Sequence, residues 1–377
     1  MRIFLFDMDG VLLESRGYHR ALQKTIRLMA LALGFAHATI SPDEIAAFEA
    51  GGISSEWDEA AIVTARLLEE AWKDNPHMLL PDSLSPSLTL SPGKRPWPNL
   101  ASLAYALSTP EMLALHPLER AARFFFGKGH RTAQQEQILH DLILGARLAE
   151  LSLTHRTFQE LVLGSSEYYR TYNLPAEHNT ESYLLKYDRS NLSDMQSAHL
   201  CGWISQPGHA ATVITSRPSR PPAGVFSTPE AELGAQLVGL KGIPILGWGG
   251  MRWLGLQTHI DPQSFLKPSP VHALAGMRMA LGERQEVALT EAADLVENGL
   301  AVSAWKELEG AEVSVFEDTP GGIKSLQAAR GILKKARITI VVKSFGIAQH
   351  QAKTAALSSL GAQLFPTLVE ALEATYQ

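Results

Sequence analysis

Residues 3–11 read Ile3-Phe4-Leu5-Phe6-Asp7-Met8-Asp9-Gly10-Val11. The apolar run that ends at Asp7 predicts a strand buried on both faces of a parallel sheet. A strand of this kind delivers its last side chains to the carboxyl edge of the sheet, where α/β proteins bind ligands. Two carboxylates at that edge would repel each other if no cation lay nearby. Asp7 and Asp9 therefore indicate a divalent metal and a phosphorylated ligand.

The chain of 377 residues continues with a helical middle part. Apolar residues at helical spacing predict amphipathic helices at 18–33, 60–72, 118–126, 138–151 and 152–163. Five prolines within residues 77–98 exclude a helix there and predict an exposed loop. The middle part, from about residue 16 to about residue 200, is thus expected to be almost wholly helical.

From about residue 205 onward, strands alternate with helices. Strands are expected at 211–215, 243–247, 313–316 and 338–342, helices at 230–240, 271–281, 291–308 and 368–376, and a glycine-rich loop at 247–250. This alternation predicts a parallel sheet covered on both sides, to which the first strand also belongs. We therefore expect a doubly wound, Rossmann-like α/β core of residues 1–15 and 205–377. A mainly helical domain of residues 16–204 is inserted after its first strand.

Three further segments place polar side chains at the ends of expected elements: Thr215, Lys267 within Phe265-Leu266-Lys267-Pro268-Ser269-Pro270, and the pair Glu317-Asp318. Taken singly, each has an ordinary structural interpretation, as a strand end, a surface charge or a helix cap. Their chemistry is nevertheless complementary. A hydroxyl donates a hydrogen bond without adding charge, a fixed ammonium stabilises an anionic transition state, and an acidic pair can bind a metal.

In this order, the segments resemble the four motifs of the haloacid dehalogenase-like (HAD) hydrolases, in particular a C1-capped, phosphatase-type member. The first motif, D-x-D-G-V/T, is matched by Asp7 to Val11, the second by Thr215, the third by Lys267 with the following Pro-Ser-Pro, and the fourth by Glu317 to Ile323. The resemblance covers the N-terminal strand and roughly residues 208–377. The insertion lies where this family places its C1-type cap.

The resemblance implies a role for each matched residue. Asp7 is the nucleophile, Asp9 is the general acid/base, and Thr215 and Lys267 bind the phosphoryl oxygens. A Mg²⁺ cofactor is held by the Asp7 carboxylate, the Asp9 main-chain carbonyl and Asp318, with Glu317 binding directly or through water. Further phosphate or substrate contacts are expected from Gly10, Ser216, Arg217 and His19, the last of which has an equally good interpretation as a partly exposed helix residue.

The implied activity is hydrolysis of a small organic phosphomonoester through an aspartyl-phosphate intermediate. A sugar phosphomutase of the same superfamily is an alternative, because a cap that excludes water would let the phosphoryl group be transferred instead. A third interpretation is a non-catalytic binding module on the same fold. Phosphate release, isomer formation or neither distinguishes the three.

Composition excludes several other classes of partner. A net charge of −6 gives no basic footprint for nucleic acid. The single cysteine, Cys201, excludes an intrachain disulfide and a cysteine-based zinc site, so a reducing, cytoplasmic setting is expected. The apolar run before Asp7 is too short for a signal peptide, and no stretch approaches the ~20 apolar residues of a membrane helix.

If exposed, the aromatic run Phe124-Phe125-Phe126 would mark the surface of a homodimer.

Overall fold

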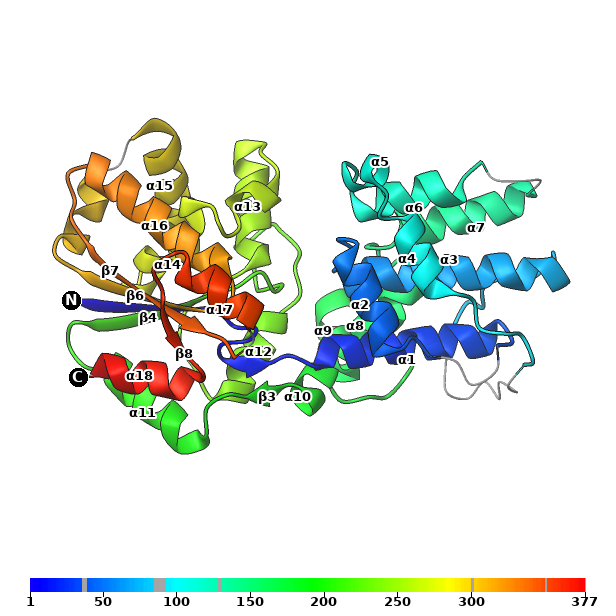
Figure 1. Cartoon of the computed structure of the whole chain (residues 1–377), viewed down its shortest axis with the longest axis horizontal. Coiled ribbons are helices and arrows are strands. Elements are labelled where there is room, and N and C mark those ends of the chain that lie inside the picture. Colours follow the sequence, from blue (N-terminus) through cyan, green and yellow to red (C-terminus); the bar gives the residue numbers. More distant parts are fainter. Residues whose placement is uncertain (36–38, 85–92, 128–130, 300–301, 350, 377) are drawn as a thin grey trace. The chain divides into compact units, whose positions relative to one another are not determined.

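In the computed structural model, residues 1–35, 39–84, 93–127, 131–299, 302–349 and 351–376 are described. The chain divides into two compact units (Figure 1). Residues Met1–Ser15 and Asp188–Gln377 form one, here called the sheet unit, and Arg16–Tyr187 form the other, here called the helical unit.

The sheet unit is built on six parallel strands in the order β5-β4-β1-β6-β7-β8. They are β1 (Arg2–Phe6), β4 (His209–Ile214), β5 (Ile245–Leu246), β6 (Glu312–Glu317), β7 (Val341–Ile347) and β8 (Gln363–Phe365). The first strand lies at the centre, where Phe6 is in register with Val213 of β4 and Phe316 of β6. The predicted doubly wound, Rossmann-like α/β fold is therefore confirmed.

Alternate residues of β1 enter two different hydrophobic cores. Ile3 and Leu5 pack on one face of the sheet, and Phe4 and Phe6 on the other. The first core also contains residues of α13 (Trp248–Thr258), α14 (Pro270–Ala280), α15 (Gln285–Asn298), α16 (Pro320–Lys335) and α17 (Gln351–Ser358). The second contains residues of α11 (Asp194–Ile204), α12 (Glu230–Val238) and α18 (Leu368–Tyr376). Helices thus cover both faces, as Figure 1 shows.

The helical insertion ends earlier than expected, because residues 188–204 belong to the sheet unit rather than to a domain of residues 16–204. The reason is the indole of Trp203 in α11, which stacks on Phe4 of β1 with ring centroids 3.9 Å apart. A short antiparallel pair, β2 (Leu13–Glu14) with β3 (Arg189–Ser190), joins the two passages of the chain within this unit.

Three expected elements of the α/β part differ in the structure. The strand expected at 338–342 instead occupies Val341–Ile347, and α13 begins at Trp248 within the expected glycine-rich loop. The expected helix at 291–308 is divided into α15 and a 3₁₀ helix, Val302–Leu308; residues 300–301 lie outside the described part. A second 3₁₀ helix, Pro262–Phe265, precedes Lys267.

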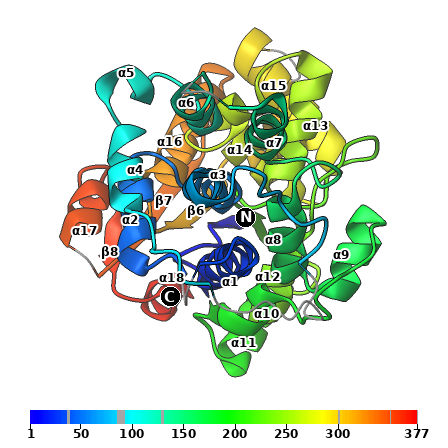
Figure 2. The ribbon, with the colours of Figure 1, turned by 90° about the vertical axis from the view of Figure 1, so that its right-hand side faces the viewer.

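The helical unit contains α1 (Gly17–Ala32), α2 (Pro42–Ala50), α3 (Glu56–Asp74), α4 (Leu100–Ala106), α5 (Pro110–Leu113), α6 (Pro117–Phe125), α7 (Ala133–Leu144), α8 (Leu153–Leu163), α9 (Ser165–Tyr172) and α10 (Tyr183–Tyr187). Helices α1, α3 and α8 pack against one another at its centre (Figure 2). In the expected proline-rich loop, the described segments 77–84 and 93–98 contain no helix, and residues 85–92, with Pro86 and Pro92, lie outside the described residues. Among the described residues, no helix has the length and apolar character that crossing a bilayer requires.

Candidate active site

The ends of the central strands bring polar residues to one edge of the sheet. Asp7 directly follows β1, and its N–H donates to the Phe316 carbonyl oxygen of β6 at 3.0 Å. On the other side, Thr215 directly follows β4 and donates its N–H to the Leu246 carbonyl oxygen at 3.0 Å. Glu317 is the last residue of β6. The parallel register therefore places these residues side by side at the carboxyl ends of the strands.

Three carboxylates converge at this edge. Each of Asp7, Glu317 and Asp318 offers an oxygen, and the three oxygens lie within 4.8 Å of one another. All three residues are buried. Hard oxygen donors in this number suit Mg²⁺, Ca²⁺ or Mn²⁺ rather than a soft metal. The donor set therefore fits a divalent cation, as predicted from the sequence.

Lys267 partly neutralises the cluster. Its Nζ lies 2.7 Å from Oδ1 of Asp7 and 2.7 Å from Oε1 of Glu317. Burial alone would lower the pKa of Lys267, but the two carboxylates outweigh burial and raise it. Burial, together with the charge of Glu317, raises the pKa of Asp7 to about 8, although Lys267 opposes the shift. Lys267 therefore compensates the two carboxylates only in part, and a cation beside them would favour the charged form of Asp7.

Two glycines allow the backbone to approach these carboxylates. Gly10 has a φ of +77°, and a Cβ atom there would lie 2.3 Å from Oδ2 of Asp318. A Cβ atom at Gly322 would lie 2.0 Å from Oε1 of Glu317. Both distances are far below a van der Waals contact, so a side chain at either position would displace a carboxylate.

Asp9 faces a different cation. Its carboxylate accepts from Nε of Arg217 at 2.9 Å and from Nη2 at 2.6 Å. Arg217 also donates to Oγ of Ser15 at 2.8 Å and to Oδ2 of Asp188 at 3.0 Å, and Ser15 itself donates to Asp9. Burial alone would raise the pKa of Asp9, but the Arg217 guanidinium and its hydrogen bonds lower it. Arg217 is therefore held to Asp9 as a bidentate partner.

The remaining predicted residues have different surroundings. Thr215 is buried, and its hydroxyl accepts from the Arg217 N–H at 3.1 Å, whereas Ser216 is exposed. His19 belongs to α1 of the helical unit, where its Nε2 lies 3.1 Å from Oε1 of Glu49. Its role in substrate binding stays a prediction.

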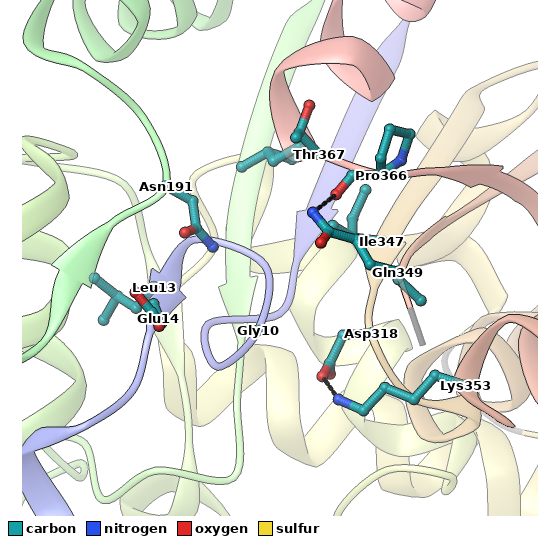
Figure 3. Close-up of a pocket in the computed structure, with 12 residues that line it drawn as sticks. Gly10, Leu13, Glu14, Asn191, Asp318, Ile347, Gln349, Lys353, Pro366 and Thr367 are labelled. Carbon is teal, nitrogen blue, oxygen red and sulfur yellow. Dashed lines mark hydrogen bonds and ion pairs between the residues drawn. The ribbon is translucent and has the colours of Figure 1, made fainter. Parts of the chain in front are cut away.

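Several residues at this edge of the sheet belong to none of the four motifs. His272 of α14 accepts from the Lys267 N–H through Nδ1 at 3.3 Å and donates from Nε2 to the Leu246 carbonyl oxygen at 3.0 Å. Lys353 of α17 forms an ion pair with Oδ2 of Asp318 (Figure 3). The sequence carries no signal for His272, Ser15, Asp188 or Lys353, because only the folded chain brings them near the carboxylates.

Comparison with known proteins adds the fold alone. No protein-family model matches the sequence, and no curated protein resembles it. A target of the Northeast Structural Genomics Consortium has a similar structure, with a TM-score of 0.54 and 14% identity over 97% of this chain and 95% of that one. Phosphatase Tt82 from Thermococcus thioreducens reaches a TM-score of 0.41 at 14% identity, over 94% of this chain and 99% of its own. The second TM-score is too low to support a similarity of fold.

Proposed function

We propose that the protein is a Mg²⁺-dependent phosphatase of the HAD-like hydrolase superfamily, with the helical unit as its C1-type cap. Its substrate is a small organic phosphomonoester. The observation that carries the proposal is the convergence of Asp7, Lys267 and the pair Glu317-Asp318, from three distant parts of the sequence, on one sheet edge.

The donor set supports a divalent cation held by Asp7, Asp318 and Glu317. When bound, Mg²⁺ supplies positive charge opposite the phosphoryl oxygens. Lys267 supplies a second, permanent positive charge, because the two carboxylates keep it protonated. Together these charges lower the repulsion between an anionic nucleophile and an anionic substrate.

In the proposed reaction, the Asp7 carboxylate attacks phosphorus and the bond from phosphorus to the leaving oxygen breaks. Asp9 gives a proton to the leaving oxygen. A water molecule then attacks the phosphorus of the aspartyl-phosphate, the bond from phosphorus to the Asp7 oxygen breaks, and phosphate leaves while Asp9 takes a proton of that water. Arg217, which lowers the pKa of Asp9, favours the carboxylate form that the second step requires and opposes the protonated form that the first step requires.

The test is release of phosphate from p-nitrophenyl phosphate by the full chain with Mg²⁺. We expect Asp7→Asn to lower kcat by about 10³-fold or more, because no other group replaces the nucleophile. The matched control is Asp261→Asn, which changes an exposed aspartate at the start of a 3₁₀ helix in the same unit. Asparagine also caps helices well, so this variant should retain full activity.

Full activity of Asp7→Asn would overturn the proposed mechanism. A chelator should abolish activity of the unaltered protein, and added Mg²⁺ should restore it. With a sugar phosphate as substrate, inorganic phosphate is the expected product. A phosphorylated isomer in its place would identify a sugar phosphomutase, and no turnover of any phosphomonoester would favour a non-catalytic binding module.

A further inference from the structure

A cavity of about 370 Å³ lies beside the carboxylate cluster in the sheet unit. Gly10 and Asp318, which belong to the cluster's own loops, form part of its lining. Other walls come from Gln349 after β7 and Thr367 before α18, as Figure 3 shows. Its volume is within the range of small-molecule sites, which begin at about 300 Å³. The cavity can therefore accept the part of a ligand that extends away from the cluster.

Lys353 is the basic residue in the lining of this cavity, as far as the described residues show. It reaches Asp318 from α17, and its side chain is 50% exposed, whereas that of Lys267 is 7% exposed. Lys267 is held by two carboxylates, whereas Lys353 pairs with the single carboxylate of Asp318. A lysine on a flexible stem, half in solvent, can change partner at small cost.

Divalent cation binding gives Lys353 a reason to change partner. A cation held by Asp318 would share that carboxylate with the ammonium, and like charges at such short range repel. The described lining of the cavity contains two acids, Glu14 and Asp318, and one base, Lys353. The cavity therefore favours an anionic group only when a cation compensates Asp318. Once the cation compensates Asp318, an anionic group in the cavity becomes the favourable partner for Lys353.

Building on the proposed phosphatase function, we propose that this cavity binds the leaving group of the substrate and that Lys353 pairs there with a second anionic group. The substrate class is then a phosphomonoester that also carries a carboxylate or a second phosphate. Lys353 exchanges Asp318 for this group when the metal is bound.

The first test compares 3-phosphoglycerate with glycerol 3-phosphate, which has a hydroxymethyl group in place of the carboxylate. We expect kcat/KM to favour the acid by about tenfold, the size of one charge-assisted hydrogen bond. Lys353→Met should abolish this preference. The matched control is Lys343→Met, which removes an equal charge from β7, where Lys343 pairs with Glu312. This variant should keep the preference.

The second test measures binding directly and does not depend on turnover. In Asp7→Asn with Mg²⁺, calorimetry should show 3-phosphoglycerate binding about tenfold more weakly when Lys353→Met is added. In the protein with Asp7 intact, Lys353→Met should bind Mn²⁺ several-fold more tightly, because a competing cation is gone. Lys343→Met should change neither affinity.

The outcomes separate the two proposals. A protein that hydrolyses p-nitrophenyl phosphate but shows no preference for the acid overturns the role of Lys353 alone. Unchanged or weaker Mn²⁺ binding by Lys353→Met overturns the exchange of partners. If no phosphomonoester is hydrolysed, the proposed function fails, and the calorimetric comparison still decides whether Lys353 binds the anion.

Discussion

Gly10 lies so close to Asp318 that a Cβ atom at position 10 would be 2.3 Å from the carboxylate oxygen Oδ2. The loop after β1 can therefore pack against Asp318, which follows β6, only because residue 10 has no side chain. This contact fixes the position of a carboxylate that we assign to the metal.

Gly10→Ala should weaken divalent cation binding and lower the free energy of unfolding. The new methyl group displaces Asp318, and a φ of +77° is itself unfavourable for alanine, by about 1–2 kcal/mol. Gly361→Ala isolates the backbone cost, because Gly361 has a φ of +75° with no atom within 4 Å of its Cβ position. Calorimetric titration with Mn²⁺ should show weaker binding in Gly10→Ala only; equal affinities would contradict the proposed fit.

Lys267→Met should destabilise the chelator-treated protein by about 3–5 kcal/mol, because it leaves buried carboxylates without their cation. Denaturant unfolding measures this loss. If the ion pairs are its cause, adding Glu317→Gln should recover part of the stability, since one of the two carboxylates at 2.7 Å from Nζ is then uncharged. Strictly additive losses would mean that Lys267 stabilises the fold in another way.

His272→Phe should lower kcat with little change in KM. Burial, with the nearby charge of Lys267, lowers the pKa of His272 to about 3, so the ring is neutral and can accept from the Lys267 N–H through Nδ1. Phenylalanine has a similar shape but leaves this N–H and the Leu246 carbonyl without their ring partner. This loss should lower the free energy of unfolding by about 1–3 kcal/mol. An unaltered kcat would show that His272 does not position Lys267.

The helical unit should become less stable as pH rises. Burial, reinforced by neighbouring glutamates, raises the pKa of Glu59 in α3 to about 9. The folded state therefore holds a proton that the unfolded state releases near its ordinary pKa of about 4.5. This contribution is fully present below pH 4.5 and is lost as pH rises towards 9, with a slope of up to about 1.4 kcal/mol per pH unit.

Glu59→Gln should flatten this dependence, because the amide stays neutral at every pH. Unfolding experiments between pH 5 and pH 9 measure the slope. The same substitution at the exposed Glu150 controls for the loss of a charge. A slope that persists in Glu59→Gln would assign the titration to another group.

The central strands and their polar ends could be predicted because the sequence of a buried parallel strand is a continuous apolar run. Residues 3–7 and 313–318 illustrate this, since each run stops at the carboxylates that the fold brings together. The apolar pattern predicts strand β7 too early, because Ile338 and Ile340 are buried in the core before the strand begins at Val341.

The start of α13 could not be predicted, because glycine disfavours helices. In the structure, Gly249 permits close packing instead: a Cβ atom there would lie 2.1 Å from the Ser219 carbonyl oxygen. Asp188 and Lys353 escaped prediction for a different reason. Asp188 contacts Arg217, and Lys353 contacts Asp318, only in the folded chain. A local sequence pattern does not predict such contacts.

The pairing of β2 with β3 makes residues 16–187 the loop of a β-hairpin in topological terms. Glu14 is opposite Arg189, so joining Ser15 directly to Asp188 would leave a connection of two residues, the shortest common hairpin loop. An excised version of the chain could thus retain an uninterrupted sheet together with Ser15 and Asp188, two of the residues that contact Arg217. The architecture is that of a doubly wound α/β unit that carries a second unit inserted at one tight turn.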